Sequence, residues 1–462
     1  MRQKIVFTLL VLLTATFFFF VLRRDSKDLV NQASTSTGGD AGPDVRAPSL
    51  DGGDGGRNDA GPTLVHSFTI GSLRAAEATS LLAASYLPQG SLSERGVPVT
   101  LRTFSDPGAL EDALALGDTG IELAVLPFAQ ALRTGDRLRA LHLTAIFVPG
   151  FSVGREALTS ERAHRIDGPG KPVSLEPSPD PSATLFSLLT LDAFGASFTA
   201  KSDAGKQDYS ATLVGRTSTL SAASFSLTSS GSIVLPFVLI APESTVRNRS
   251  AALSLLLRSW LDGQRALQED VPLGAKRAAE STGSSAAQLM EDLGTFDPAS
   301  LSTNLEAFGL SGRSAFRLSD LHQASLRVLR EHGLGAKEDD ALRFDDRIVA
   351  EVARTAPANE VKNSGIAPAP WSRAVVARVK PLETNLSRDL ARIQFSLRAF
   401  PRMSVRLVGA PAITEKAKAA LLGESIAEGR ILVERPENLA GNTLMNSGVA
   451  KPDPLVLEFL GP

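Results

Sequence analysis

The chain has 462 residues, of which 43% are hydrophobic and 21% are charged, and it contains no cysteine. Its 48 Lys and Arg residues nearly balance its 50 Asp and Glu residues, which gives a formal net charge of −2. This balance argues against a nucleic-acid-binding body, and the lack of cysteine excludes disulfides, thiolate metal sites and a cysteine nucleophile. The length is enough for two or three domains with a sizeable core.

Residues 1–24 predict a membrane anchor. The apolar run of 18 residues at 5–22 would span about 27 Å as a helix, close to the roughly 30 Å core of a bilayer. Basic residues flank the run on both sides, at Arg2, Lys4, Arg23 and Arg24. A cleaved signal peptide, the alternative, would have a shorter apolar region and a small-residue cleavage site. We expect a single-pass protein of the cell inner membrane, with most of its chain on the extracytoplasmic (periplasmic) side.

The next two segments differ sharply in composition. Residues 25–63 are rich in Gly and Asp and have few apolar side chains, so we expect a disordered tether. Residues 64–354 instead alternate strand-like and helical patterns. Strands are predicted at 64–70, 97–103, 121–126 and 141–148, and helices at 74–86 and 107–116. This alternation predicts a mostly parallel sheet, in which ligands bind beyond the carboxyl ends of the strands.

A second α/β block begins near Val173. A loop rich in Pro and Ser, at 177–182, leads into a predicted helix at 183–194, and a buried strand is predicted at 233–241. The pattern from 247 to 332 is almost wholly helical. Two α/β blocks followed by a helical return predict a two-lobed α/β protein with a cleft between the lobes.

Six short motifs occur in order between residues 64 and 350. They lie at 145–154, 166–173, 178–195, 259–262, 278–283 and 304–309. In the first motif, Phe151, Ser152 and Gly154 fit an aromatic-Ser-x-Gly turn that follows a strand. Together the motifs resemble extracytoplasmic solute-binding proteins of the nitrate/taurine/thiamine-precursor class. That class serves ABC transporters and has a two-lobed, type II periplasmic-binding-protein-like fold.

The resemblance implies that a small polar ligand binds in the cleft, that no cofactor takes part, and that an ABC transporter permease is the partner. The candidate ligand-binding residues are Gly71, Ser72, Ser152, Gly154, Ser178 and Ser182. Ser178 and Ser182 flank Asp180 before a helix, whose free N–H groups would hold an anionic or polar ligand. The alternative for this segment is an ordinary helix N-cap. The five His are scattered, so no metal site is expected.

The sequence departs from the family where the ligand should bind. Glu156 stands where the family's turn has Asp, and no aromatic residue follows the first strand. Of the few Tyr and Trp residues, only Tyr209 is placed where a cleft aromatic is expected. These departures leave open a second hypothesis, a scaffold or interaction protein that keeps the fold but has an eroded pocket.

The C-terminal part is predicted to be a separate small α/β domain, residues 372–462, after a Pro-rich linker at 355–371. Its strands are predicted at 374–379, 404–408 and 455–460, and its helices at 386–400 and 414–424. The order resembles a degenerate peptidoglycan-binding domain like that of outer membrane protein A, which makes peptidoglycan a candidate partner. The acidic motif of that domain is missing at 410–412, and only Arg430 loosely fits its arginine motif. An unrelated α/β domain is the alternative.

An enzymatic function is not expected. Gly150, Ser152 and Gly154 also fit the Gly-x-Ser-x-Gly nucleophile elbow of serine hydrolases. Such an enzyme needs an acid and a His in loops after later strands, whereas His322 and His332 fall in a charged helical region and are expected at the surface. The preferred hypothesis is a membrane-tethered solute-binding protein, and a serine hydrolase is the least favoured one.

Overall fold

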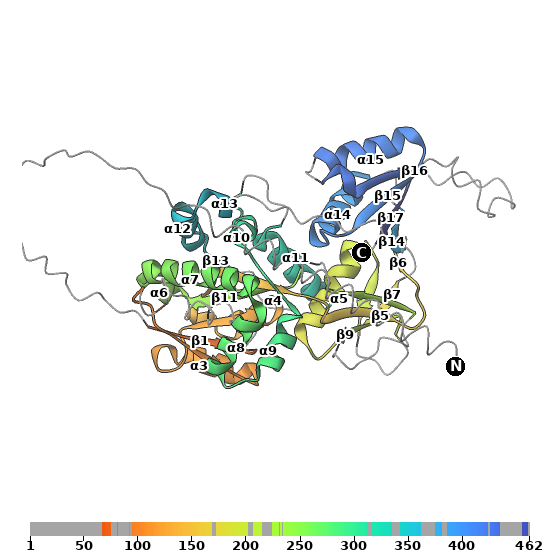
Figure 1. The fold of residues 1–462 in the computed structure, drawn as a ribbon. Helices are drawn as coiled ribbons and strands as arrows, with labels where there is room; N and C mark the ends of the chain where they lie inside the picture. Colours follow the sequence, from red (N-terminus) through yellow and green to blue (C-terminus); the bar gives the residue numbers. More distant parts are fainter. Residues whose placement is uncertain are drawn as a thin grey trace, which may run out of the picture. The chain divides into compact units, whose positions relative to one another are not determined.

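The structure is a computed structural model (Figure 1). It describes residues 67–74, 81, 92, 95–168, 172–201, 207–214, 224–230, 232, 234–311, 316–334, 342–361, 375–380, 386–423, 426–434 and 455–460. All of them belong to one compact unit, residues 62–462. The predicted anchor at 1–24 and tether at 25–63, and most of the predicted linker at 355–371, lie outside the described residues. Among the helices that are described, none is long and apolar enough to cross a membrane.

The first sheet is built mainly by the first α/β block. Its strands are β1 (Phe68–Ser72), β2 (Val99–Thr103), β3 (Leu123–Pro127), β4 (Leu143–Ser152), β11 (Pro236–Pro242), β12 (Phe296–Pro298) and β13 (Arg343–Phe344). The order is β12-β4-β11-β3-β1-β2, with β13 also paired to β4. Strands β1, β2 and β3 are parallel, as predicted, whereas β11 runs antiparallel to both β3 and β4. The edge strand β12 lies in a region whose pattern predicts helix.

Most of the helices outside the second and third sheets lie around this sheet, and one of them, α11, packs against α5 of the second block (Figure 1). They are α3 (Pro107–Ala115), α4 (Phe128–Arg137), α6 (Glu243–Asn248), α7 (Ser250–Glu269), α8 (Val271–Thr282), α9 (Ala286–Leu293), α10 (Leu301–Ala307), α11 (Leu318–Glu331), α12 (Arg347–Thr355) and α13 (Ala358–Val361). The predicted start of α3 is confirmed: Asp106 Oδ2 accepts the N–H of Ala109 at 2.8 Å, and Pro107 occupies the first turn, where its missing N–H is not needed.

The second sheet follows the same plan as the first. Its strands are β5 (Glu156–Ser160), β7 (Val173–Glu176), β8 (Phe198–Ala200), β9 (Tyr209–Leu213) and β10 (Phe225–Thr228), in the order β10-β5-β9-β7-β8. Here β7, β8 and β9 are parallel, and β5 runs antiparallel between β9 and β10. In each of these two sheets, the strand that the chain enters on crossing from the other sheet therefore runs antiparallel to both of its neighbours. The helix of this block, α5 (Pro181–Ala193), is buried along nearly its whole length.

The third sheet lies in the C-terminal region. It contains β14 (Val375–Val379), β15 (Ser404–Gly409), β16 (Ile431–Glu434) and β17 (Leu455–Leu460), with helices α14 (Leu386–Ala399) and α15 (Pro411–Gly423). The predicted α/β elements of this region are confirmed. Two strands of this sheet were not predicted. One is β16, and the other is β6 (Ile166–Asp167), from the second block, which pairs in parallel with β14 at the sheet edge.

Aromatic packing joins the C-terminal region to the second block. Phe194, at the end of α5, stacks on Phe400 with ring centroids 5.9 Å apart and meets Phe459 edge-on at 4.8 Å. Beside these rings, Ser396 Oγ donates to the carbonyl of Ala193 at 2.6 Å. Residues of this region therefore share a sheet and a core with the second block.

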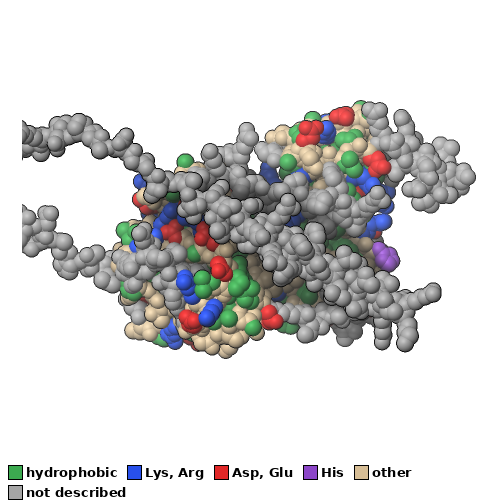
Figure 2. Space-filling view, in the orientation of Figure 1, with side chains coloured by type: hydrophobic (Ala, Val, Ile, Leu, Met, Phe, Trp, Pro, Cys, Tyr) green, Lys and Arg blue, Asp and Glu red, His purple; other side chains and the backbone are tan. Residues whose placement is uncertain are grey.

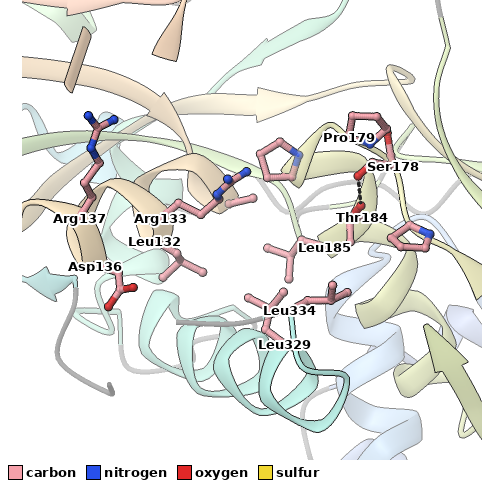
Figure 3. A pocket seen from close by; sticks show the side chains of 13 residues that line it. Leu132, Arg133, Asp136, Arg137, Ser178, Pro179, Thr184, Leu185, Leu329 and Leu334 are labelled. Carbon is pink, nitrogen blue, oxygen red and sulfur yellow. Dashed lines mark hydrogen bonds between the residues drawn. The ribbon is translucent and has the colours of Figure 1, made fainter. Parts of the chain in front are cut away.

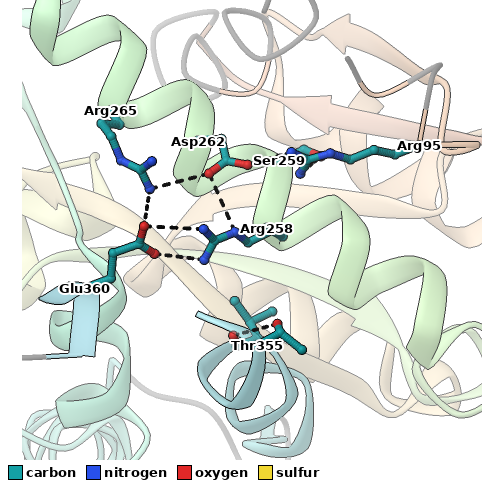
Figure 4. Close-up of polar contacts among 8 residues, drawn as sticks. Arg95, Arg258, Ser259, Asp262, Arg265, Thr355 and Glu360 are labelled. Carbon is teal, nitrogen blue, oxygen red and sulfur yellow. Dashed lines mark hydrogen bonds and ion pairs between the residues drawn. The ribbon is translucent and has the colours of Figure 1, made fainter. Parts of the chain in front are cut away.

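An ion-pair network fixes α13 against α7 (Figure 4). Arg258 donates to Glu360 at 2.8 Å and Arg265 pairs with the same carboxylate. Arg95 reaches Asp262 on α7 at 2.8 Å. On the face in Figure 2, side chains of both charge signs are interspersed among the described residues. This mixture agrees with the near-zero net charge of the chain.

Candidate functional site

A cavity of about 580 Å³ opens between α4, the loop after β7, the start of α5 and the end of α11 (Figure 3). Its leucines are Leu132, Leu185, Leu329 and Leu334, and its polar side chains are Arg133, Asp136, Arg137, Ser178 and Thr184. Since α4 follows a strand of the first sheet and α5 follows a strand of the second, residues from both lobes line the cavity. Its volume lies within the range of small-molecule sites, about 300–1,000 Å³.

Local hydrogen bonds hold the loop between β7 and α5. Asp180 is the N-cap of α5, and its Oδ1 accepts the N–H groups of Ser182 and Ala183 at 2.8 and 2.9 Å. The hydroxyl of Ser178 accepts the N–H of Asp180 at 3.1 Å, while Thr184 donates its hydroxyl to the Ser178 carbonyl at 2.9 Å. The geometry of this loop is that of an ordinary helix N-cap, the alternative that the sequence left open. This cap occupies N–H groups that a ligand would otherwise use.

The charged side chains of α4 differ in their partners. Arg137 pairs with Glu111 and Asp112 on α3, and Asp136 pairs with Arg139. Arg133 is exposed, and within the described part of the chain it forms no ion pair. Figure 3 shows its side chain extending from α4 toward the loop that carries Ser178. The cavity mouth thus carries one cation without a carboxylate partner among the described residues.

Ser152 and Gly154 lie at the crossing between the lobes and not in the cavity wall. The buried Ser152 hydroxyl donates to Glu156 Oε2 at 2.6 Å. Ser229, in the returning segment, donates to the same oxygen at 2.9 Å. Gly154 has φ +70, and a Cβ there would lie 2.9 Å from Ser230 Oγ. One carboxylate therefore joins the outgoing and returning segments beside a turn that favours glycine.

The carboxyl of Glu156 is buried at the lobe crossing. Only 2% of the residue is exposed, and burial raises the pKa of this carboxyl above its ordinary value. The hydroxyls of Ser152 and Ser229 and the charge of Arg155 act in the opposite direction, and the charge of Asp180 adds to the rise.

Gly71 and Ser72 end β1 and are packed in the first lobe. A Cβ at Gly71 would lie 2.3 Å from Ile121 Cδ1, so any side chain there would require the end of Ile121 to shift. The Ser72 hydroxyl donates to the Arg74 carbonyl and accepts the Arg74 N–H. Arg74 in turn donates to Thr295 Oγ1 at 2.8 Å. Neither Gly71 nor Ser72 lines the cavity.

Of the six candidate residues, Ser178 alone lines the cavity. Ser182 is buried in the first turn of α5, and the other four lie at the lobe crossing or the end of β1. The contribution of α4 was missed, because no helix was predicted at 128–137. Its signal was present in the spacing of Phe128, Ala131 and Leu132, at i, i+3 and i+4.

Several side chains have roles that differ from the expected ones. His322 is buried, only 7% exposed, and packs edge-on against Phe344, so its predicted surface position is wrong. Tyr209, the expected cleft aromatic, is a core residue whose hydroxyl donates to the Arg165 carbonyl at 2.9 Å. In the described ranges, His, Asp and Glu side chains form no group of three that could hold a metal ion.

Arg430 forms hydrogen bonds with backbone carbonyls of the C-terminal region. Its guanidinium donates to the carbonyls of Met403, Leu397 and Phe400 at 2.7–2.8 Å. Burial lowers the pKa of Arg430 to about 10. The residue that loosely fitted a peptidoglycan-binding motif therefore closes the turn between α14 and β15.

Comparison with solved structures finds similarities at low sequence identity. The periplasmic nitrate-binding protein from Synechocystis PCC 6803 has 13% identity and a TM-score of 0.42, with 65% of this chain and 92% of that one covered. A putative periplasmic sulfonate-binding protein from Methylobacillus flagellatus has 11% identity and a TM-score of 0.41, with 63% and 94% covered. The aliphatic sulphonate-binding protein from Escherichia coli has 13% identity and a TM-score of 0.38, with 60% and 90% covered.

No protein-family model and no curated protein matches the sequence. The two-lobed α/β architecture rests on the strand order of the two sheets and on the two crossings between them. In its ordered sequence motifs the chain resembles solute-binding proteins of the nitrate and taurine class, and the solved structures similar to it include nitrate- and sulfonate-binding proteins.

Proposed function

We propose that this protein binds a small solute between its two lobes, on the extracytoplasmic side of a membrane, and delivers it to an ABC-type importer. The observation that carries the proposal is the cavity that α4 of one lobe and the β7–α5 loop of the other line together. A ligand in such a cavity contacts both lobes, so it favours the arrangement in which they approach each other.

The lobe crossing supplies the hinge for this motion. Gly154, with φ +70, and the segment near Ser230 are the points at which the chain passes between the sheets. Glu156 joins these two segments through hydroxyl donors. In this proposal Ser152 and Gly154 position the lobes, and Gly71 and Ser72 shape the end of β1. Ser178 forms part of the cavity wall, and Ser182 lies in the capped first turn of α5 behind it.

The proposed location rests on the sequence. Residues 5–22 would anchor the chain in the inner membrane, and residues 25–63 would tether the binding region, residues 64–354. A permease partner follows from the solute-binding role. Peptidoglycan binding by residues 372–462 stays a prediction, to be tested by sedimentation of the protein with purified peptidoglycan.

Solute binding is tested by thermal shift of the full chain in nanodiscs against small anions, amines and thiamine-precursor-like heterocycles. Stabilisation by one solute class supports binding. Stabilisation by none of them at millimolar concentration favours the scaffold hypothesis instead. An esterase assay of Ser152→Ala tests the hydrolase hypothesis, which fails if background activity is unchanged.

Lobe closure has its own assay, because the chain contains no cysteine. Cysteines introduced at Leu116, which is 65% exposed in the first lobe, and at Arg162, which is exposed in the second, can carry a fluorophore pair. We expect a bound solute to change energy transfer between the two labels. Binding with unchanged transfer would contradict closure.

A further inference from the structure

We propose that the solute is an amphipathic monoanion: a small organic acid whose charged group pairs with Arg133 and whose apolar body lies against the four leucines of the cavity. This inference rests on the proposed function and names the ligand class of the same site. It also revises the expectation of a merely polar ligand.

The leucines converge from three elements (Figure 3). Leu132 comes from α4, Leu185 from α5, and Leu329 and Leu334 from the end of α11. Leu132 and Leu185 are buried, whereas Leu334 is 43% exposed beside the cavity. A surface of this kind gains from contact with an apolar body and gains nothing from a small inorganic ion. Each methylene that the leucines cover should raise the affinity roughly fourfold.

The charged side chains of the cavity determine which charged group the ligand should carry. Because Arg137 and Asp136 are already paired, Arg133 is the cavity cation that has no ion pair among the residues described. A guanidinium binds a planar carboxylate with two parallel hydrogen bonds. Asp136 also lines the cavity, so a second negative charge on the ligand would be repelled. The site should therefore prefer a monoanion to a dianion or trianion.

The hydroxyls of Thr184 and Ser178 in the cavity wall determine which hydrogen bonds a ligand can make there. Thr184 uses its proton on the Ser178 carbonyl, so its oxygen can only accept from a ligand. Ser178 is the reverse case. Its oxygen accepts the Asp180 N–H, and its own proton has no acceptor within the described part of the chain. Ser178 can thus donate to an anionic group and be a second ligand contact beside Arg133.

The test is isothermal titration of the full chain in nanodiscs, with titration of empty nanodiscs as the blank. The probes are octanoate, butyrate, octylamine and citrate. We expect octanoate to bind more tightly than butyrate, by roughly fourfold for each additional methylene that the leucines cover. Octylamine has a similar apolar body and the opposite charge, and citrate has the charge without the body, so both should bind at least tenfold more weakly than octanoate.

Two pairs of variants locate the contacts. Arg133→Gln should weaken octanoate binding at least tenfold, while Arg162→Gln, at an exposed arginine outside the cavity, should leave it unchanged. Leu334→Ser should weaken octanoate more than butyrate, and Leu116→Ser, at another exposed leucine, should weaken neither. Equal thermal midpoints without ligand show that the variants are folded.

The outcomes separate this inference from the proposed function. If a different solute class binds with lobe closure, or if octanoate binding is insensitive to Arg133→Gln, the amphipathic monoanion is wrong and solute binding stands. If neither these probes nor the wider solute screen binds, the proposed function fails together with the inference.

Discussion

Glu156 offers a direct test of how the lobe crossing is held. The carboxyl is 2% exposed, and both Ser152 and Ser229 donate to its Oε2. In Glu156→Gln the amide oxygen can take the place of Oε2 and accept both hydroxyls, so the substitution removes the charge and keeps the two hydrogen bonds. In Glu156→Ala both hydroxyls lose their acceptor.

The direction in which the stability difference changes with pH follows from the raised pKa of Glu156. A carboxyl with a higher pKa in the folded than in the unfolded state binds more protons when folded. Its contribution to stability is fully present below the unfolded pKa and is lost as pH rises through the folded pKa. Each tenfold change in the acid dissociation constant corresponds to about 1.4 kcal/mol. Glu156→Gln should therefore become more stable relative to the native chain as pH rises.

Glu156→Ala measures how much the two hydrogen bonds to Glu156 contribute to the free energy of unfolding. Each buried hydroxyl left unpaired costs about 1–3 kcal/mol, so the two together should cost roughly 2–6 kcal/mol at a pH below the ordinary glutamate value. The measurement is the free energy of unfolding in urea at several pH values between 4 and 9. Glu161→Gln, at an exposed carboxylate at the end of β5, is the control. If the difference between Glu156→Gln and the native chain were independent of pH, the assigned protonation would be refuted.

Three further changes test the crossing and the C-terminal packing. Gly154→Ala should cost about 1–2 kcal/mol of unfolding free energy for its φ of +70, plus the contact with Ser230. Gly96→Ala, with φ +73 and open space around it, should show the backbone cost alone in the same urea titration, and equal costs would dismiss the Ser230 contact. Arg430→Met leaves three backbone carbonyls without their donor and should lower the free energy of unfolding by several kcal/mol, at about 1–3 kcal/mol for each buried group. Phe400→Ala should cost about 3–5 kcal/mol, and a near-neutral result by calorimetry would show that the aromatic contact with the second block contributes little.

Helices and strands were predicted well where the residues that determine them lie together in one stretch of the chain. Helix α5 begins at Pro181 because Asp180 caps it, and both residues stand together in the sequence. Strand β17 at 455–460 is apolar except for Glu458, and its bounds could be predicted without a distant partner. Helix α4 was missed because Thr134 and Gly135 interrupt its polar pattern, although both are buried against the protein. The three-residue strand β12 exists through its pairing with β4, which no local pattern encodes.

The candidate site was harder to predict, for a physical reason. A cavity is a property of the packing between elements, and the residues that line this one span more than two hundred positions, from Ala129 to Leu334. The small and hydroxyl residues chosen from the sequence do occupy special positions, at a strand end, a lobe crossing and a helix cap. Apart from Ser178, those residues shape the backbone. The cavity is otherwise lined largely by leucines and charged residues, which look ordinary in a sequence.

The pairing of β6 with β14 has a consequence for the order of folding. Ile166 and Asp167 lie beside Ala377 and Arg378, so the edge of the third sheet is made by residues synthesised more than two hundred positions apart. The second block therefore emerges with a strand edge and the ring of Phe194 uncovered, and both stay so until the last part of the chain arrives. A chain that stops near residue 355 would carry that edge permanently. We expect such a truncation to aggregate, and to do so through the second block and not the first.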